Sequence, residues 1–158
     1  MKSKFDNLFI AADHGGFELK EKLLSFFQEN HVFFKVIDLG ICKSSSVDYP
    51  DMAHQLVKRV LENSNNLGIL ICGTGIGMSI AANRFDGIRA ALVYDDFTAK
   101  MAKAHNNANV LVLGGRITEF DVAKELINIW LTTEFEGGRH IPRLDKIDPG
   151  VSPSILYQ

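Results

Sequence analysis

Residues 69–83 have the sequence ILICGTGIGMSIAAN, and this stretch decides the fold. Its first four residues are a short, continuous apolar run, which is typical of a strand buried on both faces. The glycines within 73–77 predict a tight loop, and residues 78–83 predict the start of a helix. A buried strand that passes through a glycine loop into a helix is the repeating unit of α/β proteins.

The same order of elements recurs on both sides of this stretch. Short apolar runs alternate with segments of helical periodicity, such as Leu19, Leu23 and Phe27. Five apolar strands separated by helices predict a parallel sheet covered on both faces, in a doubly wound α/β domain. We expect a single domain over residues 1–158, with 137–158 as an irregular C-terminal tail. The predicted strands lie at residues 8–12, 32–37, 69–72, 89–94 and 110–113.

The composition is that of an ordinary soluble globular protein. The chain has 158 residues, of which 46% are hydrophobic and 23% charged, so one hydrophobic core is sufficient. Its net charge of −2 argues against a nucleic-acid-binding protein. No apolar run approaches the roughly 18 residues that a membrane span needs. Cys42 and Cys72 are far apart and no histidines cluster, so we expect a cytoplasmic protein with neither a disulfide nor a zinc site.

The glycine loop lies where α/β folds bind ligands, beyond the carboxyl end of a strand. Backbone N–H groups of a loop that opens a helix can hold an anion. The spacing GxGxG lacks the third glycine of a dinucleotide motif, because Met78 occupies that position, and no Lys-Ser/Thr follows as in a nucleoside triphosphate site. The loop could hold the oxygens of a small sugar or of its enediolate. A tight turn with glycines for packing is the alternative.

Cys72 ends the strand immediately before this loop. A thiol that faces a helix N-terminus tends to be available as thiolate near neutral pH, which makes Cys72 a candidate base. A buried, inert cysteine is the alternative. Cys42 lies in a serine-rich loop without such a setting, and we expect it to have no role.

Histidines and arginines complete the candidate site. His14 and His105 lie at the ends of elements, where their side chains can reach one cleft. Arg139 and Arg143 lie in the proline-containing tail, and Arg116 follows a glycine pair. The planar fork of arginine suits a phosphate group, although each of these residues alone would be an ordinary surface residue. Together with the thiol and the glycine loop, they predict a site for a phosphorylated small molecule.

Seven motifs follow one another along the chain: ADHGG (12–16), DYPD (48–51), CGTGIGMSIAAN (72–83), RAAL (89–92), HNNANVL (105–111), GGR (114–116) and FEGGRHIPR (135–143). In this order they resemble the type B ribose-5-phosphate isomerases and the related galactose-6-phosphate isomerase subunits. The resemblance covers about residues 8–146, and the 72–83 block alone is highly specific.

The resemblance implies a three-layer Rossmann-like fold with a five-stranded parallel sheet. It also implies a homodimer, or a tetramer, whose active sites use both subunits. The implied reaction interconverts D-ribose 5-phosphate and D-ribulose 5-phosphate through an enediol intermediate, without a metal or other cofactor, in the non-oxidative pentose phosphate pathway. The partner is then a small sugar phosphate, and neither nucleic acid nor membrane is involved.

Positions that match the motifs take the family's residue roles. Cys72 resembles the base that moves a proton between C2 and C1 of the sugar. By the same resemblance, sugar handling and ring opening fall to Asp13, Thr74 and His105; enediolate stabilisation to Gly73, Gly75, Gly77 and Ser79; phosphate binding to His14, Arg116, Arg139 and Arg143; and lining of the site to Tyr49 and Asn106.

Three other functions are open from the sequence. An isomerase of a six-carbon sugar 6-phosphate, such as galactose or allose 6-phosphate, uses the same chemistry. The lactose-pathway enzyme, however, uses two different subunits, whereas this chain carries a complete set of site residues. A non-catalytic sugar-phosphate or nucleotide binding module on the same fold has no need of Cys72 together with His105. A cysteine-dependent hydrolase is disfavoured, because the spacing indicates no base and orienting partner for the thiol.

Overall fold

The computed structural model describes residues 5–30, 32, 34–40 and 46–150 of the chain. Its centre is one sheet of five parallel strands, as the apolar runs predict. Cys42, predicted to have no role, lies outside the described residues. The strands are β1 (Asn7–Ala12), β2 (Lys35–Asp38), β3 (Asn66–Cys72), β4 (Ala90–Leu92) and β5 (Val110–Gly114).

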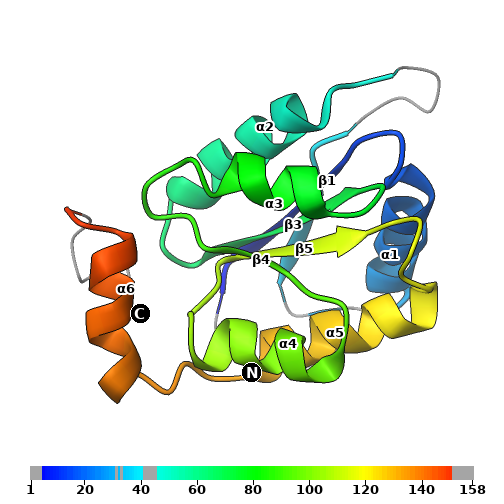
Figure 1. Cartoon of the computed structure of the whole chain (residues 1–158). Coiled ribbons are helices and arrows are strands. Elements are labelled where there is room, and N and C mark those ends of the chain that lie inside the picture. Colours follow the sequence, from blue (N-terminus) through cyan, green and yellow to red (C-terminus); the bar gives the residue numbers. More distant parts are fainter. Residues whose placement is uncertain (1–4, 31, 33, 41–45, 151–158) are drawn as a thin grey trace.

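Helices cover both faces of the sheet (Figure 1). Successive side chains of a strand point to opposite faces, so Leu8 and Ile10 of β1 pack in one core cluster and Phe9 packs in the other. This arrangement confirms the predicted three-layer, doubly wound fold. No helix in the described part of the chain is long and apolar enough to cross a membrane. Helices α1 (Phe17–Glu29), α4 (Asp96–Ala104) and α5 (Phe120–Thr132) cover one face, and α2 (Tyr49–Leu61) and α3 (Ile76–Ala82) cover the other.

The strand order β2-β1-β3-β5-β4 determines where a ligand can bind. The chain passes from β1 to β2 on one side and then returns to β3 on the other side of β1, so the strand order reverses between β1 and β3. Ligands of such sheets bind beyond the carboxyl ends of the strands at this switch point. Ala12 at the end of β1 is in register with Ile71 of β3. The residues that follow, Asp13 and Cys72, therefore lie at the switch point.

Helix α4 leads from the carboxyl end of β4 back to the amino edge of the sheet, where β5 begins. Its N-cap is Asp95, whose carboxylate accepts hydrogen bonds from the backbone N–H and the hydroxyl of Thr98, at 2.7 and 2.8 Å. These bonds hold the pKa of Asp95 below its ordinary value, the backbone bond being the larger cause. The C-cap of α4 is His105, which therefore lies before β5 and not after it.

The C-terminal segment contains helices that the sequence does not predict. A 3₁₀ helix, η1 (Gly138–His140), leads into α6 (Ile141–Ile147), so the prediction of an irregular tail is wrong for these residues. Pro142 lies in the first turn of α6, where the missing N–H costs no helical hydrogen bond. Leu144, 1% exposed, is the buried anchor of the helix. One buried position in seven residues is too short a pattern to reveal helical periodicity.

A buried ion pair fastens α6 to the amino-terminal edge of the sheet. Arg89, 7% exposed, donates to the carboxylate of Asp148, 5% exposed, at 3.0 Å. Two other nitrogens of Arg89 donate to the carbonyl oxygens of Asn106 and Asn107, at 2.9 and 3.1 Å. One guanidinium group thus joins the start of β4, the end of α4 and the end of α6.

We expect Asp148→Asn to destabilise the fold strongly, because it leaves the Arg89 guanidinium buried without its counter-charge. Breaking a buried ion pair typically costs about 3–5 kcal/mol. Asp121→Asn is the matched control, since Asp121 is 87% exposed and pairs with Lys124 on the surface of α5, where such pairs contribute about 0–1 kcal/mol. Urea unfolding measures both variants, and equal losses would show that the buried pair does not fasten α6.

Candidate active site

Three loops meet at the carboxyl edge of the sheet, backbone against backbone. A Cβ atom on Gly15, in the loop between β1 and α1, would lie 2.9 Å from the backbone nitrogen of Gly73, in the loop between β3 and α3. A Cβ atom on Gly115, in the loop between β5 and α5, would lie 2.6 Å from the carbonyl oxygen of Gly15. The loops approach each other more closely than side chains would allow, so glycine is required at these contacts.

Asp13 shapes the first of these loops. Its side chain is 6% exposed, and its Oδ1 atom accepts hydrogen bonds from the N–H groups of Gly15 and Gly16, at 2.8 and 3.1 Å. An aspartate that binds the backbone N–H two residues later forms a turn by itself. The carboxylate is therefore fixed at the switch point, and the next residue, His14, is exposed beside it.

Cys72 ends β3 with its thiol directed at the glycine loop. The side chain is 5% exposed, and the N–H of Gly75 donates to Sγ over 3.1 Å. Gly75 has a φ of +79°, a left-handed conformation that glycine adopts without strain. This turn directs the N–H group at the sulfur. The thiol is thus held in one place, at the edge where the Asp13 carboxylate also lies.

Two side chains from other elements close over the same loop. The ring of Tyr49 lies against Gly77, where a Cβ atom would be 2.7 Å from the ring carbons. A guanidinium nitrogen of Arg116 lies 3.2 Å from the position of a Cβ atom on Gly73. The structure therefore gathers ten of the predicted site residues at the carboxyl edge: Asp13, His14, Tyr49, Cys72, Gly73, Thr74, Gly75, Gly77, Ser79 and Arg116.

Four other predicted site residues lie at the opposite, amino-terminal edge. His105 ends α4 before β5 begins, whereas Cys72 ends β3. Since β5 has five residues and a strand rises about 3.3 Å per residue, the two edges are roughly 16 Å apart. Within one chain, the prediction that His14 and His105 reach one cleft is therefore wrong. The residues at the amino edge are His105, Asn106, Arg139 and Arg143.

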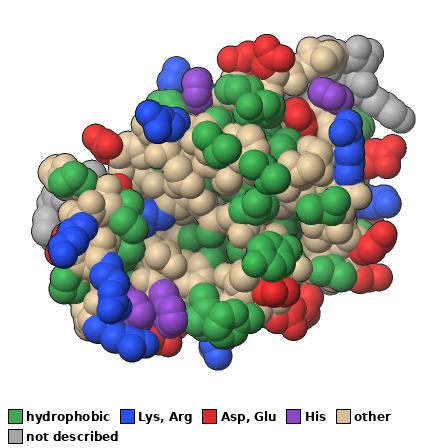
Figure 2. Space-filling view, viewed as in Figure 1, with side chains coloured by type: hydrophobic (Ala, Val, Ile, Leu, Met, Phe, Trp, Pro, Cys, Tyr) green, Lys and Arg blue, Asp and Glu red, His purple; other side chains and the backbone are tan. Residues whose placement is uncertain are grey.

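The C-terminal segment lies against the end of α4 and holds this second group together. The ring of His140 stacks on the ring of His105, with centroids 4.2 Å apart. The N–H of Glu136 donates to the carbonyl of the last residue of α4 at 3.0 Å. Arg139 and Arg143 are exposed near His140, and Figure 2 shows Lys and Arg side chains gathered beside histidines over α6 and the end of α4. This basic surface suits an anion such as a phosphate group.

Sequence reasoning missed the residues that hold the second group in position. Glu136 and His140 are four positions apart within a quoted motif, a spacing that could have indicated neighbouring side chains on a helical turn. No local signal connects Arg89 to Asp148, which are 59 positions apart.

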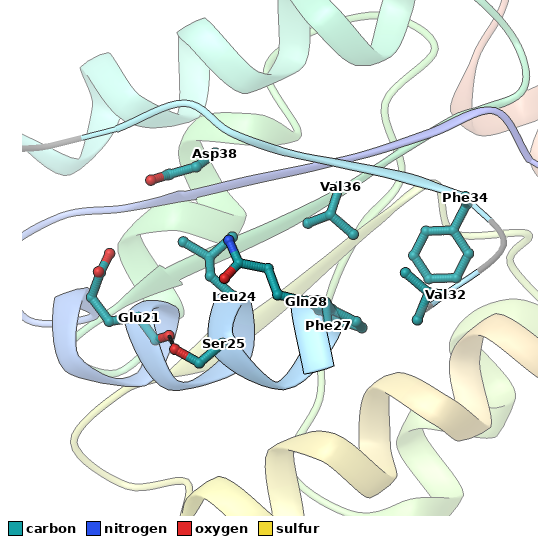
Figure 3. A pocket seen from close by; sticks show the side chains of 9 residues that line it. All are labelled: Glu21, Leu24, Ser25, Phe27, Gln28, Val32, Phe34, Val36 and Asp38. Carbon is teal, nitrogen blue, oxygen red and sulfur yellow. Dashed lines mark hydrogen bonds between the residues drawn. The ribbon is translucent and has the colours of Figure 1, made fainter. Parts of the chain in front are cut away.

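A surface hollow between α1 and β2 has the wrong chemistry for a phosphorylated ligand. It measures about 540 Å³, and much of its wall is apolar (Figure 3). Its charged lining residues are Glu21 and Asp38, whose carboxylates contact Nζ of the buried Lys20 at 3.1 and 2.7 Å. Two carboxylates around one buried ammonium group repel a phosphate, so we do not place the substrate there.

Known proteins resemble this chain over nearly its whole length. A sequence profile of the ribose/galactose isomerase family matches residues 8–147. A Bacillus subtilis protein provisionally named a sugar phosphate isomerase is 48% identical over 139 residues, which are 87% of this chain and 92% of that protein. Ribose-5-phosphate isomerase B of Escherichia coli is 42% identical over 138 residues, which are 87% of this chain and 91% of the E. coli protein.

A solved structure shares the fold. It is that of ribose-5-phosphate isomerase B from Mycoplasma genitalium with bound ribulose-5-phosphate, and it matches this structure with a TM-score of 0.86 at 42% sequence identity. The match covers 93% of this chain and 96% of the M. genitalium chain. The likeness therefore includes the sheet and the segments at both of its edges.

We expect Gly115→Ala to lower the free energy of unfolding, because its Cβ would press on the carbonyl oxygen of Gly15, which no side-chain rotation can move. Overpacking of this kind typically costs about 1–3 kcal/mol. Gly73→Ala is the matched control, since its Cβ would meet only the flexible side chain of Arg116, at 3.2 Å. Urea unfolding compares the two variants. A Gly115→Ala chain as stable as Gly73→Ala would contradict the close packing of the three loops.

Proposed function

The chain belongs to the ribose/galactose isomerase family, and we propose that it interconverts D-ribose 5-phosphate and D-ribulose 5-phosphate with Cys72 as the base. The observation that carries this proposal is the buried thiol at the switch point, with the N–H of Gly75 3.1 Å from its sulfur. The ribulose-5-phosphate bound to the M. genitalium protein supports the same class of substrate. The reaction belongs to the non-oxidative branch of the pentose phosphate pathway.

The chemistry moves one proton between neighbouring carbons. In open-chain ribose 5-phosphate, the thiolate of Cys72 takes the proton from C2. The electrons of that C–H bond form a C1–C2 double bond, and the carbonyl oxygen on C1 becomes negative. The thiol then returns the proton to C1, while a proton passes from the oxygen on C2 to the oxygen on C1, which leaves the ketose. A positioned base of this kind contributes typically about 10²–10⁴-fold in rate.

The negative charge that develops on the sugar oxygen needs donors that are already in place. The backbone N–H groups from Gly73 to Gly77 and the hydroxyl of Thr74 lie on the loop that follows the thiol and on the first turn of α3. Ser79 supports this loop, since its hydroxyl donates to the carbonyl of Ile76 at 2.9 Å in the first turn of α3. Preorganised donors contribute about 2.7–4 kcal/mol each to such a transition state.

The amino-edge group supplies the remaining functions of the site. We assign phosphate binding to Arg139 and Arg143, together with His14 and Arg116 of the carboxyl edge. The cyclic sugar opens when its ring oxygen gains a proton and its C1 hydroxyl loses one, and an imidazole such as His105 can exchange protons near neutral pH. Asn106, next to it, and Tyr49 line the site.

The two groups act on one sugar only if they come from two copies of the chain. The two edges of a single copy are roughly 16 Å apart, which is too far for one five-carbon substrate to contact both. We therefore assign Cys72 to one subunit and His105 to its partner. A homodimer with twofold symmetry then contains two identical composite sites.

An apolar surface beside the carboxyl edge supports this assembly. It consists of large exposed side chains on α3, before and at the start of α4, and after β5 (Figure 2). Large contiguous apolar patches are rare on monomers, and a twofold dimer buries the same patch on both partners. Its burial would bring the second copy close to Cys72. The residues are Ile76 (54% exposed), Ile80 (61%), Tyr94 (66%), Phe97 (71%) and Ile117 (68%).

We expect the purified chain to convert ribose 5-phosphate into ribulose 5-phosphate, with or without EDTA. Cys72→Ala should abolish turnover, because it removes the base, but should still bind ribose 5-phosphate, because the phosphate contacts remain. Cys42→Ala is the matched control, since Cys42 is the other thiol of the chain. Ribulose 5-phosphate formation measures turnover, and titration calorimetry measures binding.

Each component of the proposal has its own contradicting result. Full activity in Cys72→Ala would remove the thiol as the base. Loss of activity in EDTA, restored by a divalent ion, would replace the metal-free mechanism. Faster turnover of galactose or allose 6-phosphate would indicate a six-carbon substrate. Binding of all these sugars without turnover would indicate a non-catalytic binding module.

A further inference from the structure

Two histidines and a glutamate at the amino edge lie close enough to bind one metal ion. Oε2 of Glu136 is 3.4 Å from Nε2 of His140 and 3.8 Å from Nε2 of His105. One ligand atom from each of the three residues lies within 4.8 Å of the others. In a tetrahedral zinc site with bonds of about 2.0–2.1 Å, neighbouring ligand atoms are about 3.4 Å apart. Two of the three separations, those from Glu136 to each histidine, are thus close to those of such a site.

The buried nitrogen of His140 independently indicates a ligand. His140 is 6% exposed, and its Nε2 atom has no hydrogen-bond partner among the described residues. A buried polar atom without a partner costs free energy, and the Nε2 atom of a neutral imidazole is a common metal ligand. A metal ion bound beside Glu136 would satisfy this nitrogen.

The backbone brings the three residues together from two segments. Gly137 and Gly138 have φ values of +62° and +52°, in the left-handed region that favours glycine. The turn that they form places Glu136 and His140 on the same side, against the end of α4 where His105 lies. The positions of the three residues are therefore set by the fold of the backbone and do not depend on a bound ion.

We propose that His105, Glu136 and His140 form a site for Zn²⁺ that reversibly inhibits the enzyme. Two imidazoles and a carboxylate are a ligand set that zinc uses with a fourth, open position. His105 is 34% exposed and Glu136 is 54% exposed, so the ion can enter from solvent. The two rings now stack at 17° to each other, and His105 must turn about χ2 to direct its lone pair at the ion. This torsion is soft in histidine.

Inhibition is expected because one of the three proposed zinc ligands, His105, is also the residue to which ring opening is assigned. A zinc ion on His105 occupies the lone pair that the free imidazole would use to exchange a proton with the sugar. The inhibitory effect therefore rests on the proposed isomerase function. Zinc binding itself does not, because it depends only on the three side chains.

The test measures zinc binding and activity separately. The zinc-free full chain is titrated with Zn²⁺ in competition with a chromophoric zinc indicator. We expect one zinc ion per chain, and we expect Glu136→Gln to weaken binding by at least about tenfold, as loss of a group that supports a metal typically does. Glu125→Gln is the matched control, because Glu125 is an exposed glutamate on α5, away from the cluster. Both substitutions are at exposed positions and leave the core intact.

The activity arm compares each variant with its own zinc-free rate. Zn²⁺ should inhibit the wild type and Glu125→Gln at the concentrations that saturate the site, EDTA should reverse the inhibition, and Glu136→Gln should resist it. Equal zinc affinity in wild type and Glu136→Gln would overturn the proposal, as would binding that is lost in Cys72→Ala and retained in Glu136→Gln. Zinc binding that depends on Glu136 in a chain that does not isomerise ribose 5-phosphate would support the site and contradict the proposed function.

Discussion

All five strands of the sheet run in the same direction, and the rest of the structure depends on this constraint. Every residue that directly follows a strand lies at one edge of the sheet, and every residue that directly precedes a strand lies at the other edge. Cys72 ends β3 and His105 precedes β5, so no adjustment of loops within one chain brings both to the same sugar. The composite site that we propose is the consequence of strand polarity, because a second copy can present its amino edge to the carboxyl edge of the first.

The two edges differ in chemistry as well as in position. The carboxyl edge offers a thiol, a buried carboxylate and glycine N–H groups, which suit proton transfer and a developing oxyanion. The amino edge offers arginines and stacked imidazoles, which suit a phosphate group and, as we infer, a zinc ion. Contacts that admit only glycine fix the first edge, and the buried pair of Arg89 and Asp148 fixes the second. Both must be rigid, since catalytic groups lose much of their effect when they are misplaced by about 1 Å.

The carboxyl edge could be predicted from the sequence because its signals are local. An apolar run followed by a glycine loop places Cys72 at a strand end, and an aspartate before two glycines marks the end of β1. The amino edge could not be predicted in the same way, because it depends on contacts between distant segments. Arg89 pairs with Asp148, which is 59 positions away in the sequence. Helix α6 has a single buried residue, Leu144. Periodicity detects neither feature, so helix α6 emerges only from the structure.

Mixing two inactive variants tests the shared site most directly. Cys72→Ala and His105→Ala each break both sites of their own dimers, whereas a mixed dimer has one site with both lesions and one intact site. After equal, random mixing, half of the dimers are mixed, so we predict recovery of about a quarter of the wild-type activity. Native mass spectrometry verifies that subunits have exchanged. If exchange occurs and the mixture stays as inactive as its parents, Cys72 and His105 act within one subunit, and the division of the site between two copies is contradicted.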